Sequence, residues 1–164
     1  MTVDQEISET KIRRTSQTGP GWIEISLPIV TVSEANGGSK RRVKRIKNKI
    51  ETKVTKGEHW TDKHSRHKRQ KGAVALLLKP LRSHLKLPCH ITLTRYAPSK
   101  LDRFDNLPMS MKWILDACCE IITGDYRPGR ADDTEEIDVT YKQVVSNEYG
   151  VKIRIEMVGY QRDI

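Results

Sequence analysis

The chain has 164 residues, with 30 Lys and Arg against 21 Asp and Glu and a formal net charge of +9 at pH 7. This length suits one domain with a core of its own. The longest apolar run, residues 73–78, is far shorter than the ~20 residues of a membrane helix. The polar N-terminus lacks the apolar stretch of a signal peptide. We therefore expect a cytoplasmic protein with no membrane partner.

Residues 1–20 are polar and end in Gly-Pro-Gly, which predicts a disordered or loosely held arm. The remaining residues, 21–164, are then expected to form a single domain. Residues 22–32 are β-branched and partly alternating, a pattern typical of a strand. Pro28 should place that part of the strand at a sheet edge or a bulge, because proline cannot donate a backbone hydrogen bond.

Residues 61–81 predict a helix that is basic at its start and buried towards its end. Pro80 should end or kink this helix. Residues 89–96 alternate between apolar and polar positions and predict a second strand.

Residues 107–122 predict a second helix, with apolar residues at three-and-four spacing that form one buried face. Pro108 is well placed as the first helical residue, with Asn106 as the N-terminal cap. Gly124 should end the helix, because glycine is typical of the position after a helix C-terminus.

Residues 137–145 and 151–158 alternate and flank a turn-forming stretch, which predicts a hairpin. Strands at both ends of the chain with helices between them favour an α+β fold. We expect a small mixed or antiparallel sheet with two main helices packed on one face.

The three cysteines suit a reducing compartment, since their number is odd, two are adjacent and no C-x-x-C pair is present. Neither a disulfide framework nor a zinc site is predicted. We expect buried thiols at Cys89, Cys118 and Cys119.

Positive charge is concentrated in residues 40–71, which contain 14 Lys and Arg and three acids, a local charge of +11. Since the whole chain carries +9, the other residues together carry −2. A one-sided basic segment is typical of nucleic-acid binding, and a solvated charged arm is the alternative. The candidate DNA-binding residues in this segment are Lys40, Arg41, Arg42, Lys44, Arg45, Trp60, Lys63, Arg66, Lys68 and Arg69.

Acidic residues interrupt this basic protein at the ends of predicted elements. Asp102 and Asp105 lie between the strand 89–96 and the following helix, and Asp132 and Asp133 precede the next strand. Carboxylates on a DNA-binding surface would repel phosphate unless a cation lay between them. Mg²⁺ takes such oxygen ligands and promotes phosphodiester hydrolysis. This pattern indicates a nuclease, although an acidic turn is the simpler alternative for Asp132 and Asp133.

Lys112 and Asp116 are four residues apart and should share the helix face opposite to the buried one. A lysine near the metal could hold a phosphate oxygen or stabilise the transition state. The alternative is a solvent-exposed helical ion pair.

These residues together resemble the RusA-like Holliday junction resolvases, a family widespread in phages and prophages. The matching features, in chain order over residues 89–158, are a strand ending near Arg-Tyr-Ala-Pro, the motif Asp105-Asn106-Leu107 opening a helix, Lys112 with Asp116, and the pair Asp132-Asp133. Asn36 and the segment 59–71 resemble the family's N-terminal half, which adds Asn36 to the expected DNA contacts.

The resemblance implies a RusA-like homodimer that resolves four-way DNA junctions in recombination and repair. It implies dependence on Mg²⁺, with Mn²⁺ as a substitute metal, and no small-molecule cofactor. Asp105 and Asp133 would be metal ligands, joined by Asp102, while Lys112 would be the catalytic lysine and Asn106 would orient the motif. The cellular setting would be a bacterium or a phage-infected host.

The chain departs from the family pattern at two positions. Arg103 occupies the place of the usual first acid of the motif, and Met109 occupies the usual lysine position. A nucleic-acid-binding protein of the same fold with weakened or lost catalysis is therefore the main alternative. A basic structural protein that binds RNA or an assembly partner is a third, but it leaves the acidic residues unexplained.

Overall fold

The structure is a computed structural model that describes residues 12–33, 40–46, 49–55, 60–127, 130–132 and 134–159, with the backbone alone for 40–46 and 49–55. Asn36, Asp133 and residues 1–11 of the predicted arm lie outside these ranges, and the expectations for them stay predictions. Within the described ranges, no helix has the length and apolar character needed to cross a membrane.

Five strands form one mixed sheet with the order β1-β2-β7-β5-β6. All neighbouring pairs are antiparallel except β5 and β6, which are parallel. This arrangement confirms the predicted α+β class and the mixed sheet. The strands are β1 (Thr15–Gly19), β2 (Trp22–Leu27), β5 (Cys89–Ala97), β6 (Ile137–Val145) and β7 (Gly150–Met157).

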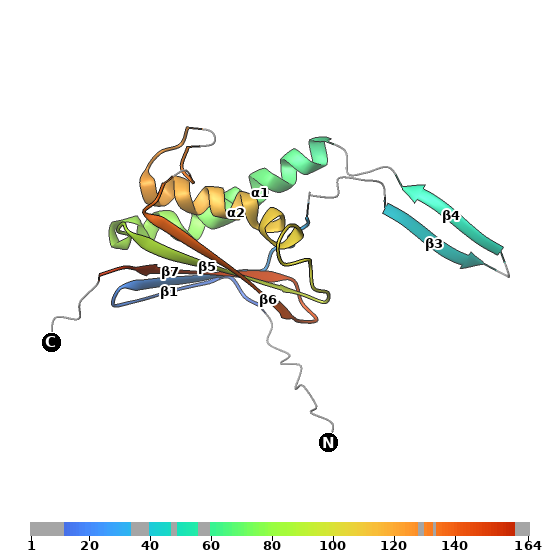
Figure 1. Ribbon diagram of the computed structural model, residues 1–164, viewed down its shortest axis with the longest axis horizontal. Coiled ribbons are helices and arrows are strands. Elements are labelled where there is room, and N and C mark those ends of the chain that lie inside the picture. Colours follow the sequence, from blue (N-terminus) through green and yellow to red (C-terminus); the bar gives the residue numbers. More distant parts are fainter. Residues whose placement is uncertain are drawn as a thin grey trace, which may run out of the picture.

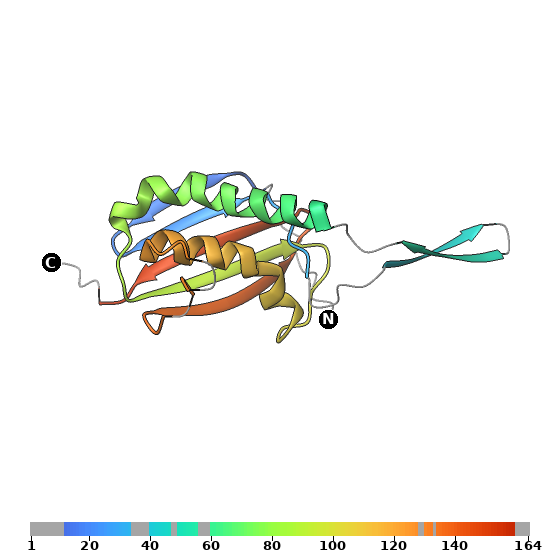
Figure 2. The same cartoon turned by 90° about the horizontal axis from the view of Figure 1, so that it is seen from above.

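Two helices, α1 (Trp60–Leu78) and α2 (Asn106–Thr123), pack against each other on the same side of the sheet (Figure 1). Seen from above, both helices lie side by side over the sheet and run roughly along its strands (Figure 2). Pro80 lies in a short 3-10 helix, η1 (Lys79–His84), so α1 ends before it as predicted. Gly124 follows α2 with φ +74°, a left-handed conformation that glycine adopts without steric cost.

The hydrophobic core lies between the sheet and the two helices. Alternate residues of β2, β5 and β7 are buried, as the pleat of a strand requires when one face is covered. Ile91, Leu93 and Ile153 are fully buried in the sheet, while Leu78 and Ile114 meet them from the helices. All three cysteines are free and buried, which confirms the expectation for the thiols.

The prediction of an arm over residues 1–20 is wrong for β1. Its residues pair with β2 along the whole strand, from Thr15 opposite Ser26 to Gly19 opposite Trp22. Backbone hydrogen bonds hold this exposed edge strand, and its side chains are polar. The sequence therefore lacks the alternation of apolar residues that would predict a strand. In consequence β2 is an interior strand, and Pro28 lies just past its end instead of at a sheet edge.

The predicted hairpin of the last two strands is also wrong, because β5 lies between β6 and β7. The strand β6 pairs with β5 in parallel from Cys89 opposite Ile137, after the crossover through α2. The alternating and well-buried β5 is thus an interior strand of the sheet, and β7 is its central strand. The short connection after β6 crosses the end of β5, where the Ser146 N–H donates to the Ala97 carbonyl at 3.0 Å.

Part of the basic segment forms a separate two-stranded antiparallel ribbon, β3 (Lys40–Ile46) with β4 (Lys49–Thr55). Figures 1 and 2 place this ribbon apart from the sheet. The sequence does not predict these strands, because the dense charge hides the alternation of Val43, Ile50 and Val54.

Candidate functional site

The loop before α2 holds two of the predicted metal ligands, Asp102 and Asp105. Asp102 forms a tight turn, since its Oδ1 accepts the N–H groups of Phe104 at 3.0 Å and Asp105 at 2.9 Å. Asp105 is exposed and occupies the N-terminal cap position, but its side chain makes no capping hydrogen bond. One oxygen of Asp102 is therefore used by the backbone, while the Asp105 carboxylate faces solvent.

Asn106 is the first helical residue of α2, so the predictions of Asn106 as the cap and Pro108 as the first helical residue are wrong. The Ser33 hydroxyl donates to Asn106 Oδ1 at 2.6 Å. This bond ties the start of α2 to the segment after β2, and that segment is itself held by a buried arginine. Arg95 donates to the Thr31 hydroxyl at 3.0 Å and to the Ser99 carbonyl at 2.7 Å.

Arg95 lies on β5 and is only 4% exposed. Burial lowers the pKa of its guanidinium, because desolvation disfavours the charged form. The alternation of strand 89–96 places position 95 on the face directed towards the core. The positive charge of arginine, however, is typical of an exposed residue. Arg95 and its two hydrogen bonds fix the base of the loop that presents Asp102 and Asp105.

Phe104 is the single phenylalanine of the chain, and it is 86% exposed between Arg103 and Asp105. The Arg103 guanidinium carbon lies 5.8 Å from its ring centroid. An aromatic ring held in water on a tight turn is available to stack on a partner. The sequence analysis did not single out this residue, although a lone phenylalanine among charges is a visible signal.

Three functional candidates follow one face of α2. Lys112 and Asp116 come seven and eleven residues after Asp105, which is close to whole numbers of helical turns. Eleven residues correspond to ~16 Å along the helix axis. Asp105 therefore lies well away from Asp116, although the two residues share a face.

Asp116 is buried more than predicted, with its side chain 17% exposed against 46% for Lys112. The Lys112 Nζ lies 3.6 Å from Asp116 Oδ1. Burial raises the pKa of Asp116, Lys112 lowers it, and the nearby carboxylate of Asp132 raises it further. The expectation that Lys112 and Asp116 both lie on the solvent face is thus wrong for Asp116, whose side chain is mostly buried.

The carboxylates of Asp132 and Asp116 also raise the pKa values of two other buried groups. Burial, then Asp132 and Asp116, raise the pKa of the Cys119 thiol to about 12. The pKa of Tyr141 on β6 is raised mainly by burial, with contributions from Cys119 and both carboxylates. Asp132 is therefore close enough to the second half of α2 for its charge to act on Asp116, Cys119 and Tyr141.

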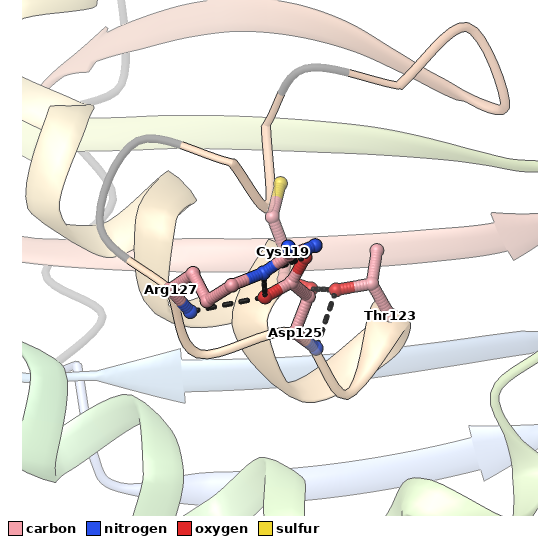
Figure 3. Close-up of polar contacts among 4 residues, drawn as sticks. All are labelled: Cys119, Thr123, Asp125 and Arg127. Atoms are coloured by element: carbon pink, nitrogen blue, oxygen red, sulfur yellow. Dashed lines mark hydrogen bonds and ion pairs between the residues drawn. The ribbon is translucent and has the colours of Figure 1, made fainter.

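The loop after α2 is anchored at its start by a chain of hydrogen bonds (Figure 3). The Thr123 hydroxyl donates to the Cys119 carbonyl at 2.7 Å and accepts the Asp125 N–H at 3.1 Å. Arg127 forms an ion pair with Asp125 at 2.6 Å, and these hydrogen bonds lower the pKa of Asp125 to about 2. This anchor fixes the start of the loop that carries Asp132.

Among the described residues, no group of three or more His, Cys, Asp or Glu is arranged to hold a metal ion. Asp133, the fourth acid of the predicted set, lies outside those residues. A Mg²⁺ ion is commonly bound through one or two carboxylates, with water and phosphate oxygens as its other ligands. Asp116 and Asp132 fit that smaller requirement better than Asp102 and Asp105, because the charge of Asp132 raises the cost of charging the partly buried Asp116.

The predicted DNA-binding residues divide between two elements. Five lie on β3, namely Lys40, Arg41, Arg42, Lys44 and Arg45, and five lie on α1, namely Trp60, Lys63, Arg66, Lys68 and Arg69. On α1, Trp60, Lys68 and Arg69 are exposed, whereas Lys63 and Arg66 are half-buried.

A groove of about 680 Å³ separates α1 from α2, and sequence reasoning missed it. Lys68, Lys71 and Lys79 line it from α1 and η1, while Trp113 and Tyr126 line it from α2 and the following loop. The three lysines are spaced by three and then eight residues, which places all of them on one face of a helix. This spacing could have indicated a basic surface from the sequence.

Searches against family models and against curated proteins found no match for this chain.

Proposed function

We propose that this protein is a Mg²⁺-dependent endodeoxyribonuclease that resolves Holliday junctions or related branched DNA by paired phosphodiester hydrolysis. The observation that carries the proposal is the mostly buried Asp116, which pairs with Lys112 and is subject to the negative charge of Asp132. A mostly buried carboxylate near a second carboxylate is costly to keep charged without a cation.

The chemistry assigned to Mg²⁺ is polarisation of the phosphodiester and activation of a water nucleophile. Asp116 and Asp132 would hold the ion. The resemblance adds Asp133, which directly follows Asp132 in the sequence. It also implies Asp105 and Asp102 as ligands, but Asp105 lies ~16 Å along α2 from Asp116, too far to bind the same ion. Lys112 is half-exposed beside Asp116, so its ammonium can contact a substrate phosphate.

DNA binding is supported by the two basic elements. The β3–β4 ribbon carries seven Lys and Arg against one acid over its described strands. A two-stranded ribbon fits the major groove of B-DNA, and lysine and arginine contact phosphates. The exposed ring of Phe104 beside Asp105 can stack on a base next to the cleaved strand. A homodimer would supply the two sites that a two-fold symmetric junction needs.

The test is cleavage of a synthetic four-way junction with Mg²⁺, with Mn²⁺ and with EDTA. Paired nicks that require the metal are expected, and Asp116→Asn should lower the cleavage rate at least 100-fold while junction binding persists. Asp138→Asn serves as the matched control, because Asp138 is an exposed acid on β6. Absence of cleavage with every metal, together with salt-sensitive junction binding, would refute the nuclease proposal.

Junction binding without cleavage would support the alternative, a catalytically weakened or inactive nucleic-acid-binding protein of the same fold. Two observations favour it: Arg103 replaces an acid of the family motif, and no group of three metal-ligating side chains occurs within the described ranges.

A further inference from the structure

The groove between α1 and α2 has the properties of a strand-binding site distinct from the carboxylates. Lys68, Lys71 and Lys79 line one side, and Lys68 and Lys79 are exposed at its rim. Lys68 makes no ion pair with any residue in the described part of the chain, whereas Lys71 pairs with Glu120 at 2.5 Å. The groove therefore keeps a net positive charge after this pairing.

Aromatic rings lie beside these lysines. The Lys71 ammonium is 5.7 Å from the ring centroid of Trp113, and that of Lys79 is 5.9 Å from the ring centroid of Tyr126. The His67 ring stacks on Trp113 with centroids 4.0 Å apart, which holds the indole in place. Tyr126 is 51% exposed, so its ring remains accessible.

Part of the groove lining consists of small residues. Gly72, Ala75 and Ala117 line it, and a Cβ added at Gly72 would meet no atom within 4 Å. The space above Gly72 is therefore open to a flat group. The volume lies in the range of small-molecule sites, ~300–1,000 Å³, and is too small to admit a duplex.

We propose that this groove binds an unpaired strand of DNA, with its phosphates on Lys68, Lys71 and Lys79 and a base on the Tyr126 ring. Alternating cations and aromatic rings are the features by which proteins bind single strands without sequence preference. Lys68 and Lys79 are eleven residues apart, or ~16 Å along a helix, which spans about four or five phosphates of a stacked strand.

This inference rests on the proposed function in one respect, namely that the substrate is branched DNA with unpaired nucleotides near the branch. Its site is separate from the carboxylates, so the two can fail independently. Loss of cleavage in Asp116→Asn with unchanged single-strand binding would concern the nuclease alone.

The test is fluorescence anisotropy of the full chain with a labelled 12-nucleotide oligo(dT) and with a duplex of equal length. Gly72→Leu fills the groove without changing charge, and it should weaken single-strand binding at least 10-fold with duplex binding within 2-fold. Gly72→Ala, at the same position, should leave both affinities within 2-fold. Lys68→Gln with Lys79→Gln should weaken single-strand binding and reduce its salt slope by about 1.4.

Lys142→Gln on β6 is the charge control and should change nothing, because Lys142 is exposed and absent from the groove. Circular dichroism establishes that each variant is folded, and if Gly72→Leu does not fold, the double lysine variant decides. Wild-type single-strand affinity in the folded groove variants would overturn the proposal. So would an equal loss of duplex binding, or competition by a 12-residue poly-glutamate as strong as by unlabelled oligo(dT).

Discussion

Replacing Asp116 by Asn should abolish a stabilisation of the protein by Mg²⁺. In the absence of metal, burial and Asp132 disfavour the charged form of Asp116 more than Lys112 favours it. A cation between the two carboxylates would offset this cost. With a dissociation constant of ~1 mM, as for weak oxygen-ligand sites, 10 mM Mg²⁺ would contribute about 1.4 kcal/mol. For a domain of this size, that corresponds to a rise in Tm of about 3–6 °C.

The assay is thermal unfolding at pH 7.5 with 10 mM MgCl₂, and with EDTA and NaCl at matched ionic strength. The rise should disappear in Asp116→Asn and Asp132→Asn, and persist in Asp62→Asn, an exposed acid on α1. If the rise persists in Asp116→Asn but is lost in Asp105→Asn, the cation lies at the start of α2 and the reasoning from the Asp116 environment is refuted.

The pH dependence of the metal-free protein supplies a second check on Asp116. Because its pKa is raised on folding, the native state binds that proton more tightly than the unfolded chain does. The contribution of this group to stability is therefore greatest at low pH and declines as pH rises above its unfolded pKa of ~3.9. Asp116→Asn should raise Tm at pH 7 relative to the wild type and should lose this advantage near pH 3.

Other predictions follow from the fold. Leu93→Ala removes a fully buried side chain from the interior strand β5 and should lower the free energy of unfolding by about 2–5 kcal/mol, as measured by urea denaturation. Gly124→Ala should cost about 1–2 kcal/mol in the same assay, because φ is +74° there; an unchanged midpoint would contradict this. The three buried cysteine thiols should react with a thiol reagent only after denaturation, and fast labelling of the native protein would show that they are accessible. In an NMR titration Asp125 should ionise near pH 2, and Arg127→Gln should return it towards pH 4.

The candidate site was only partly readable from the chain. The positions of Asp105, Lys112 and Asp116 on one helix face follow from their spacing, and the helix itself was predicted from its apolar residues and Gly124. The burial of Asp116 could not be read in this way, because it depends on which distant segments pack against the helix. The groove forms only because α1 and α2 lie side by side. The sequence of either helix does not reveal that the two are in contact.

Local pattern alone determined α2, β2, β5, β6 and β7 from their periodicity and α1 from its basic start and apolar end, together with the separation of the basic segment from the acids. These features depend on residues within a few positions of one another, and local pattern reports them directly. Tertiary structure alone decided that β1 is a strand, that β5 separates β6 from β7, and that the charge of Asp132 acts on Asp116. Each of these depends on backbone pairing or packing between segments distant in sequence, which side-chain periodicity does not encode.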